Sequence, residues 1–398
     1  MLVRKAYKFR LYPNQAQQEL LAVQFGHTRF VYNYMLGLRK ERYQETGEGL
    51  SYQDMTALLT ELKRDPEHQW LREADSQVLQ QSLKDLDRAC QNFFAGRARY
   101  PRFRSRRGKQ AIRYPQRVRA DVAAGRSYLP KIGWVKTIFH RPLEGQVKNV
   151  TVSRTKRGRY YAAFQVEVEM PEPVCRGGEN GLDLGLKDFA ILSDGRKLAN
   201  PRHLIRAERR LRRLQRSLSR RQKDSAGWER GRQLVARQHE KVANCRADYQ
   251  HKMSRVLVED HRLLAVEALN IKGMVCSKHL AKHIADASWG QFIRMLAYKG
   301  EWYGCDLVVV DRFFPSSKTC SQCGTVIEKM PLHVRKWDCP ICHTHHDRDI
   351  NAAQNILKQA TAGTAGSHAD GVHVRPAYMQ AGTQKSEAHY FSGSSLIC

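Results

Sequence analysis

The stretch GLDLGLKDFAILSDG, residues 181–195, combines a mostly apolar run with an early carboxylate, Asp183. A short apolar run of this kind is typical of a buried strand, and the Asp194-Gly195 pair is a signal for a two-residue hairpin turn. A carboxylate inside an apolar strand is costly unless it binds a partner. The stretch therefore predicts a strand hairpin in which Asp183 is a candidate ligand-binding residue.

Two further carboxylates stand in comparable contexts. Glu267 ends the apolar run 263–266, which predicts a strand with a carboxylate at its tip. Asp349, within DRDINAA (347–353), starts a predicted helix, where an aspartate is often only a cap. Phosphodiester cleavage by divalent ions needs several carboxylates at one point, because Mg²⁺ prefers oxygen ligands and two ions stabilise the attacking and leaving oxygens. One acid on a first strand, one on a later strand and one on a last helix is the order of an RNase H-like nuclease.

The charge of the chain indicates its class of partner. Its 398 residues include 68 Lys and Arg but only 39 Asp and Glu, a formal net charge of +29. Such a surplus repels itself unless a polyanion offsets it, so a nucleic acid is the natural partner. A membrane surface would also attract it, but no apolar run approaches the roughly 18 residues of a spanning helix, and we find no signal peptide. With 41% hydrophobic residues, a globular protein is expected.

Four of the ten cysteines form two tight pairs separated by fifteen residues, CSQC (320–323) and CPIC (339–342). Two such knuckles can bind one zinc ion tetrahedrally through Cys320, Cys323, Cys339 and Cys342. Because sulfur fills every position, no place remains for water, and the zinc is expected to be structural. The other cysteines are scattered, which fits a reducing cytoplasm with one metal site better than disulfides.

Strand patterns occur at the start of the chain and again near its middle. Residues 7–12 alternate apolar and polar side chains as in a half-buried strand, which Pro13 ends. VKNVTVSR (147–154) and YYAAFQVEVEM (160–170) show the same character around a turn. We expect these strands to pair with the first one in a small β-barrel, followed by a linker at 171–180.

Helical and basic patterns fill most of the remaining chain. Residues 15–94 repeat apolar side chains at helical spacing, including Phe93 and Phe94 near the end, and predict a helical domain inserted into the barrel. Residues 202–252 predict a basic helical hairpin, with either a solvated or a nucleic-acid-facing surface. The segment 97–117 is densely basic, with interleaved aromatic residues suited to phosphate contacts and base stacking, or it is a solvated loop. Its candidates are Arg102, Arg104, Arg106 and Arg107, with Tyr100, Phe103 and Tyr114.

The chain resembles TnpB, the transposon-encoded relative of the type V CRISPR effectors, over nearly its whole length. The motifs that carry the resemblance are RLYPN (10–14), RFVYN (29–33), PRFR (101–104), GLDLGLKDFA (181–190), VEAL (266–269), FPSSKTCSQCG (314–324) and HDRDINAAQNI (346–356). The resemblance implies that Asp183, Glu267 and Asp349 are catalytic and hold two Mg²⁺ or Mn²⁺ ions. Asp188 and Asp347 are expected to lie outside the metal ligands.

The resemblance also implies an RNA-guided DNA endonuclease of a transposon, located in the prokaryotic cytoplasm with the nucleoid. Its partners would be a guide RNA from the transposon end and double-stranded target DNA, with the protein itself a monomer on the RNA. Pairing would read the target, while protein side chains read a short adjacent motif. Tyr52, Ser76 and Gln80 are candidates for that contact, since a glutamine can bond adenine bidentately.

The implied fold class is α/β plus a β-barrel and a helical domain, with an RNase H-like (RuvC) nuclease domain that contains an inserted four-cysteine zinc ribbon. The expected segments are 1–13 as the first barrel (wedge) strand, 14–110 as the helical recognition domain, 111–172 as the rest of the barrel, 173–311 as the first nuclease part with the basic hairpin, 312–345 as the zinc ribbon, 346–360 as the last nuclease part and 361–398 as a flexible tail.

Two other functions are compatible with these patterns. One is a transposase or resolvase that acts without RNA, and the other is a DNA-binding regulator without catalysis. An intact carboxylate trio argues against the regulator. No helix-turn-helix is apparent in the sequence, and the cysteine knuckles lack a reading helix. Protein side chains alone are therefore not expected to read a long target, which favours the RNA-guided nuclease.

Overall fold

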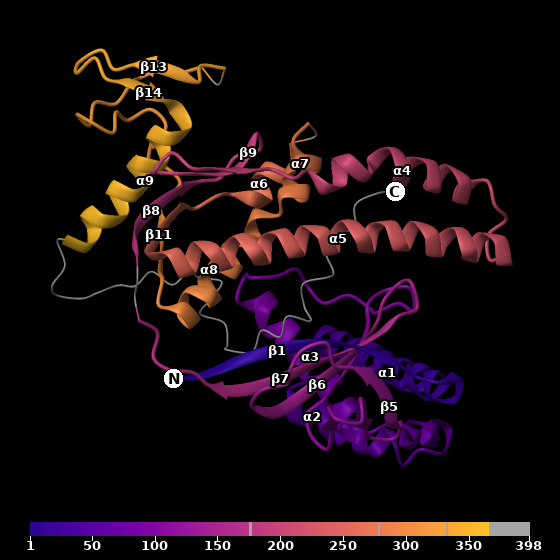
Figure 1. The fold of residues 1–398 in the computed structure, drawn as a ribbon. Coiled ribbons are helices and arrows are strands. Elements are labelled where there is room, and N and C mark those ends of the chain that lie inside the picture. Colours follow the sequence, from indigo (N-terminus) through magenta and orange to yellow (C-terminus); the bar gives the residue numbers. More distant parts are fainter. Residues whose placement is uncertain (175–176, 278, 332, 366–398) are drawn as a thin grey trace. The chain divides into compact units, whose positions relative to one another are not determined.

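The computed structural model describes residues 1–174, 177–277, 279–331 and 333–365. They divide into two compact units, the first ending at Met170 and the second beginning at Pro171 (Figure 1). Within the described residues, none of the helices is long and apolar enough to cross a lipid bilayer.

The first unit contains an antiparallel seven-stranded sheet with the order β2-β6-β7-β1-β5-β4-β3, a half-barrel with β2 and β3 as its outer strands. The strands are β1 (Leu2–Tyr12), β2 (Gln110–Tyr114), β3 (Arg119–Asp121), β4 (Arg126–Leu129), β5 (Gly133–Ile138), β6 (Gln146–Arg154) and β7 (Tyr160–Glu169). The expected pairing with the N-terminal strand is confirmed for β7, which pairs with β1 along ten residues. It is wrong for β6, which pairs with β7 instead, and the other neighbour of β1 is β5.

Three helices and a 3-10 turn make up the rest of this unit: α1 (Gln15–Thr46), α2 (Tyr52–Leu62), η1 (Pro66–Glu73) and α3 (Ser76–Phe94). Asn14 caps α1 by accepting from the Gln17 backbone N–H, and the Gln17 side chain accepts from the Asn14 N–H in return. The helices predicted over 15–94 are present, in one compact unit with the sheet. The apolar stripe ends earlier than expected, however, because Leu83 and Leu86 are buried whereas Phe93 and Phe94 are exposed.

The second unit is built on a five-stranded sheet with the order β10-β9-β8-β11-β12. Its strands are β8 (Gly178–Asp183), β9 (Asp188–Leu192), β10 (Lys197–Ala199), β11 (His261–Glu267) and β12 (Asp306–Val310). The neighbours β8, β11 and β12 run parallel, while β9 and β10 are antiparallel. The linker expected over 171–180 is wrong at its end, since residues 178–180 already pair with β11.

The predicted β9–β10 hairpin is confirmed, but its turn is longer than expected. The Leu192 N–H donates to the Arg196 carbonyl, which leaves three residues in the loop. Gly195 adopts a φ of 91°. A three-residue loop of this kind combines a type I turn with a left-handed residue, a position that glycine fills without strain. The Asp-Gly pair thus marked the turn correctly but not its length.

The helices of the second unit are α4 (His203–Ser219), α5 (Ala226–Asp260), α6 (Ile271–Val275), α7 (Ala281–Ala287), α8 (Trp289–Tyr303) and α9 (Arg348–Ala365). The predicted basic hairpin is confirmed, because α4 and α5 run antiparallel and side by side (Figure 1). Helix α9 continues to residue 365, so the tail expected from 361 begins later than predicted, and its remaining residues lie outside the described ones.

Candidate active site and metal centre

The sheet of the second unit places two of the three predicted carboxylates at one edge. Asp183 is the last residue of β8 and Glu267 the last residue of β11. These strands are parallel neighbours in which Leu182 pairs with Val266, so both carboxyl ends reach the same edge of the sheet. The two acids therefore stand side by side, one residue beyond a buried pair.

Helix α9 brings the third carboxylate close to this edge. Asp349 lies in its first turn, and the helix packs against β8. The approach is tight at Gly181, where an added Cβ would lie 2.0 Å from the Ala353 carbonyl oxygen. Only glycine permits two backbones to come this close. Gly181 thus seats α9 beside the strand that ends at Asp183.

The three carboxylates share one electrostatic field. Burial raises the pKa of Asp183 to about 7, and the negative charges of Asp349 and Glu267 contribute to the rise. Burial also raises the pKa of Glu267. Like charges held together in a poorly solvated place disfavour ionisation of one another. A divalent cation would remove this repulsion, so the donor set fits a hard cation such as Mg²⁺.

An arginine occupies part of this field. Arg335 donates to the Asp349 carboxylate at 3.2 Å. Within the described residues, the oxygens of Asp183, Glu267 and Asp349 are not all within 4.8 Å of one another. Ligands of two ions spaced about 3.5–4 Å apart need not be that close. Release of Asp349 from Arg335 is the local change that would free this carboxylate for a cation.

Asp347 makes contacts different from those of Asp349. Its carboxylate accepts from the backbone N–H groups of Asp349 and Ile350 and from the ammonium of Lys197 at 2.9 Å. Burial opposes ionisation, but these hydrogen bonds outweigh it and lower the pKa of Asp347. This aspartate therefore caps α9. Asp188, also expected outside the ligand set, is the first residue of β9.

The four cysteines of the two knuckles come together as predicted. Their Sγ atoms all lie within 4.8 Å of one another. Cys320 and Cys342 are 3.6 Å apart, and Cys323 and Cys339 are 3.5 Å apart. A tetrahedral zinc with bonds of about 2.3 Å has sulfurs about 3.8 Å apart, so the cluster fits zinc. Hydrogen bonds with Thr325 lower the pKa of Cys323 to about 6, whereas burial raises the pKa of Cys320 to about 11. A bound cation would favour the thiolate form of both.

The knuckle segment is fastened directly to α9, a feature that sequence reasoning missed. Asn351 donates to the Thr319 carbonyl at 2.7 Å and accepts from the Ser321 N–H at 2.9 Å. One turn later, Asn355 donates to the carbonyls of Ser316 at 2.9 Å and Thr319 at 2.6 Å. Both asparagines are buried. Their spacing of four residues places both on one helix face, and this spacing could have indicated from the sequence that they share a partner.

We call the hydrogen bonds of Asn351 and Asn355 to residues 316–321 the clamp. On the other side of the cysteine cluster, the strands β13 (Lys336–Asp338) and β14 (His345–Asp347) also connect it to α9. His346 in β14 is buried, lies 3.1 Å from the Cys320 sulfur and packs on Trp337. Arg348 donates to the Pro331 carbonyl at 2.8 Å. The segment between the cysteine cluster and Asp349 is therefore short and held at several points.

A second cluster of potential ligands lies in the first unit. Atoms of Asp65, Glu67 and His68 are within 4.8 Å of one another. The carboxylate of Asp65 is already engaged, because it accepts from the Glu67 backbone N–H as the cap of η1 and pairs with His68 at 2.6 Å. We regard this cluster as a helix cap.

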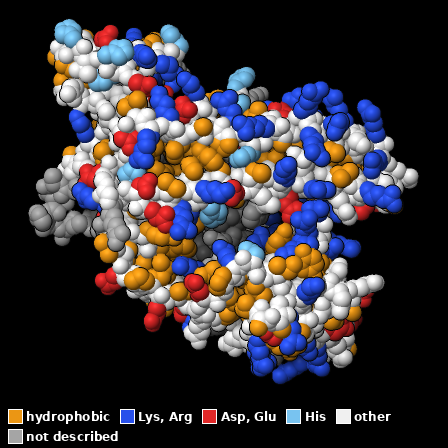
Figure 2. Space-filling model, in the orientation of Figure 1, with side chains coloured by type: hydrophobic (Ala, Val, Ile, Leu, Met, Phe, Trp, Pro, Cys, Tyr) orange, Lys and Arg blue, Asp and Glu red, His pale blue; other side chains and the backbone are white. Residues whose placement is uncertain are grey.

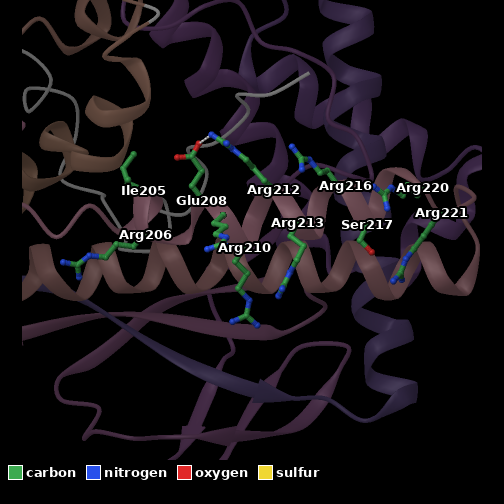
Figure 3. Close-up of a pocket in the computed structure, with 11 residues that line it drawn as sticks. Ile205, Arg206, Glu208, Arg210, Arg212, Arg213, Arg216, Ser217, Arg220 and Arg221 are labelled. Atoms are coloured by element: carbon green, nitrogen blue, oxygen red, sulfur yellow. Dashed lines mark hydrogen bonds and ion pairs between the residues drawn. The ribbon is translucent and has the colours of Figure 1, made fainter.

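Helix α4 carries a dense arginine face, and its side chains line an open depression (Figure 3). Lysine and arginine side chains gather over this helical hairpin (Figure 2). Glu208 pairs with Arg212 and Lys282. Six arginines are exposed and have no carboxylate partner within the described residues: Arg206, Arg209, Arg210, Arg213, Arg216 and Arg220. This uncompensated charge favours the nucleic-acid-facing alternative for the hairpin.

The three candidate base readers lie on two neighbouring helices, Tyr52 at the start of α2 and the other two in the first turns of α3. Ser76 and Gln80 are exposed and one turn apart on α3. Lys63 donates to the Ser76 hydroxyl at 3.2 Å, and Lys84 lies over the ring of Tyr52 at 5.7 Å. Two of the three candidates thus have a lysine beside them, Lys63 at Ser76 and Lys84 at Tyr52.

The four candidate arginines of segment 97–117 have unequal environments. Arg102, Arg106 and Arg107 are exposed. Arg104 lies over the ring of Tyr32 at 3.7 Å and pairs with Asp85 at 3.2 Å, so its charge is largely used within the protein. The aromatic residues also differ. Tyr114, a candidate for base stacking, is fully buried in the sheet core and cannot stack on a base.

Comparison with known proteins identifies the family. Three family models match the chain: "Probable transposase" at 163–278, "Cas12f1-like, TNB domain" at 289–356 and "Helix-turn-helix domain" at 1–48. Over residues 1–48, which the helix-turn-helix model matches, the structure has strand β1 followed by the single helix α1.

A Streptomyces pristinaespiralis protein named "Putative RNA-guided DNA endonuclease" is 39% identical over 91% of both chains. The Escherichia coli K12 protein "Putative RNA-guided DNA endonuclease InsQ" is 36% identical over 89% of this chain and 91% of its own. A Cas12f1 chain in complex with guide RNA and target DNA is 15% identical and covers 89% of this chain and 99% of its own, with a TM-score of 0.34, too low for structural conclusions. Sequence identity of this extent shows that the chain belongs to the TnpB family of IS605-type transposases.

Proposed function

We propose that this protein is an RNA-guided DNA endonuclease whose catalytic residues are Asp183, Glu267 and Asp349. The observation that carries the proposal is geometric: Asp183 and Glu267 end neighbouring parallel strands at one sheet edge, and the first turn of α9, which packs on β8, carries Asp349. The names of the relatives support the RNA-guided character. The sheet order, with three parallel strands and an antiparallel hairpin, supports an RNase H-like (RuvC) nuclease fold.

In this proposal Asp183, Glu267 and Asp349 would hold two Mg²⁺ or Mn²⁺ ions. Bound ions would supply an activated water and stabilise charge on the phosphodiester. The carboxylates would hold the ions in place and balance their positive charge. The sheet edge fixes the positions of two of these carboxylates, Asp183 and Glu267. Arg335 contacts Asp349. When Asp349 binds an ion, the guanidinium of Arg335 would move away from it and contact a phosphate of the nucleic acid. The zinc centre of Cys320, Cys323, Cys339 and Cys342 has no open position and would be structural.

We assign the remaining roles by segment. Residues 1–13 and 111–172 would form the wedge domain, with β2 starting one residue earlier at Gln110. Residues 14–110 would form the recognition domain and read the motif next to the target through Tyr52, Ser76 and Gln80. The nuclease would comprise 173–311 and 346–360, with the zinc ribbon at 312–345. The guide RNA would come from the transposon end.

Replacing the guide segment of the bound RNA tests this function. Cutting should move to any DNA that matches the new guide beside the same short motif, because pairing supplies the sequence information and protein side chains read only the motif. Mismatches near the motif should reduce cutting most, since pairing must nucleate there. The measurement is cleavage of plasmids that carry the old or the new target.

Two outcomes of that experiment would favour a transposase or resolvase that acts without RNA. They are cleavage at the old site after guide replacement and full cleavage after RNase digestion of the complex. Sequencing the RNA that copurifies with the protein provides an independent control. A discrete RNA from the transposon end agrees with the proposal.

The exposed arginines of segment 97–117 should contribute to the salt dependence of binding. Neutralising phosphates releases counterions, with a slope of about 0.7–0.9 logarithmic units per contact. Changing Arg102, Arg106 and Arg107 together to glutamine should therefore reduce the slope of log Kd against log salt by about 2–3. Arg104→Gln is the matched control, and it should leave the slope nearly unchanged because Arg104 is paired with Asp85. An unchanged slope in the triple variant would assign the segment to solvent.

A further inference from the structure

Four aromatic side chains, three exposed and one partly buried, gather in the first unit where α3 ends and the chain turns back. The rings of Phe93 and Phe94 are 5.3 Å apart, and those of Phe93 and Tyr100 are 5.1 Å apart. Lys40 joins the fourth ring, since its ammonium lies 4.7 Å from Phe103 and 5.7 Å from Tyr100. We call Phe93, Phe94, Tyr100 and Phe103 the aromatic patch.

The outer rings of the patch are open to solvent to an unusual degree. Phe94 is 68% exposed and Phe103 is 56% exposed. Exposure of a large apolar side chain to water is unfavourable, and a group of such exposed side chains marks an interaction surface. The core of the helical domain does not need these two rings, because Leu83, Leu86 and Cys90 fill it on the same helix.

The patch is held in place at both ends. After α3, the N–H groups of Arg97 and Ala98 donate to the Asn92 carbonyl at 2.8 and 3.1 Å, which fixes the reversal of the chain. At the other end, Asn33 of α1 exchanges two hydrogen bonds with the backbone of Arg104, at 2.7 and 2.9 Å. A surface ordered in advance loses little entropy on binding.

The chain around these rings is rich in arginine and has no acidic residue nearby in the sequence. The segment RARYPRFRSRR (97–107) contains six arginines and no acid. Only Arg104 among them forms an ion pair within the described residues. The exposed others are Arg97, Arg99, Arg102, Arg106 and Arg107. Rings interleaved with cations are the composition that binds unpaired bases by stacking and their phosphates by charge.

We infer that the aromatic patch is a stacking site for unpaired bases of RNA, with Phe94 and Phe103 as the residues that contact them. RNA is preferred over duplex DNA because a folded single strand presents unstacked loop bases, whereas the bases of a duplex are covered by their neighbours. The choice of RNA rests on the proposed RNA-guided function. The stacking site itself rests on the exposure and charge of the patch.

The test uses the full-length protein without added divalent ions, so that no cleavage occurs. Binding is followed by fluorescence anisotropy with a short unstructured RNA, a DNA strand of the same sequence and the matching DNA duplex. Phe94→Ala/Phe103→Ala should weaken RNA binding about 5- to 150-fold per stacked base and leave the salt slope unchanged. Duplex binding should not change.

Two controls separate stacking from folding and from general hydrophobicity. Phe94→Tyr/Phe103→Tyr keeps both rings and should retain the affinity for RNA. Trp134→Ala removes an exposed ring beside Arg126, elsewhere in the same unit, and should also leave RNA binding intact. Copurification of a discrete RNA and guide exchange test the proposed function separately.

Three results would overturn the inference. One is unchanged RNA affinity in the double alanine variant. Another is a larger loss for the DNA strand than for RNA, which would assign the patch to DNA. The last is a concentration-dependent dimer of the wild-type protein that the variant abolishes while RNA binding stays intact, which would make a second copy the occupant.

Discussion

Asp183→Asn should abolish DNA cleavage and at the same time stabilise the metal-free protein at neutral and alkaline pH. Loss of an outer-shell partner of a metal ligand already costs about 10–100-fold in activity. Loss of a ligand itself should therefore cost more than about 100-fold, with nucleic-acid binding largely intact. The Glu267→Gln and Asp349→Ala variants should lose cleavage in the same way.

The stability effect follows from the raised pKa of Asp183, about 7 in the fold against 3.8 as the ordinary value. A carboxyl group with a raised pKa is harder to ionise in the folded than in the unfolded chain. The wild-type protein should therefore lose stability as pH rises from about 4 to about 7, and the cost should stay constant above pH 7. At about 1.36 kcal/mol per pH unit, this cost is on the order of 4 kcal/mol.

Thermal melting of both proteins between pH 4 and pH 8, without divalent ions, measures this difference. The variant should melt higher than the wild type near pH 8 and equally near pH 4. Mg²⁺ should raise the melting temperature of the wild type only, because a ligand that binds the fold stabilises it. Asp306→Asn is the matched control, since Asp306 begins β12 at the opposite end of the same sheet. Full cleavage by Asp183→Asn would overturn the site assignment.

Asp183 and Glu267 could be singled out as candidates because each breaks a local rule, whereas Asp349 stands where an aspartate is usually only a cap. Asp183 and Glu267 interrupt or end apolar strands, and such exceptions point to function when no partner explains them. The sequence did not reveal how α9 reaches them. That depends on the backbone contact of Gly181 with Ala353, where the informative feature is a missing side chain. A glycine beside the candidate acid was visible, but its partner was not.

Other features depended on packing that periodicity does not encode. Phe93 and Phe94 continue a helical stripe, yet the helix runs past the core and leaves them exposed. Tyr114 looked like part of a basic loop but lies in the short strand β2, which pairs with β6. Arg104 resembles its neighbours in sequence and differs because α1 offers it Tyr32 and Asn33. Long-range contacts decided each of these cases.

Cys339→Ser should remove one equivalent of zinc and weaken catalysis through α9. Cys339 is fully buried, and the loss of one thiolate opens the tetrahedral site. Structural zinc contributes local folding energy, about 10–16 kcal/mol in isolated finger peptides. Without it, residues 316–321 should lose order, and the hydrogen bonds from Asn351 and Asn355 should be lost with them. Asp349, two residues before Asn351, would then be poorly held.

Metal analysis and hydrogen exchange together test this coupling. Cys339→Ser should lose zinc and show faster amide exchange at 316–321 and in the first turns of α9. Asn351→Ala should keep its zinc but weaken the clamp, so that more Mg²⁺ is needed for half-maximal cleavage. Cys276→Ser, an exposed free thiol outside the cluster, should keep both zinc and activity. Protein with four reduced thiols and no zinc would contradict the structural role. Unchanged exchange in α9 after zinc loss would show that the clamp holds without the metal, because the buried asparagines alone would then fix Asp349.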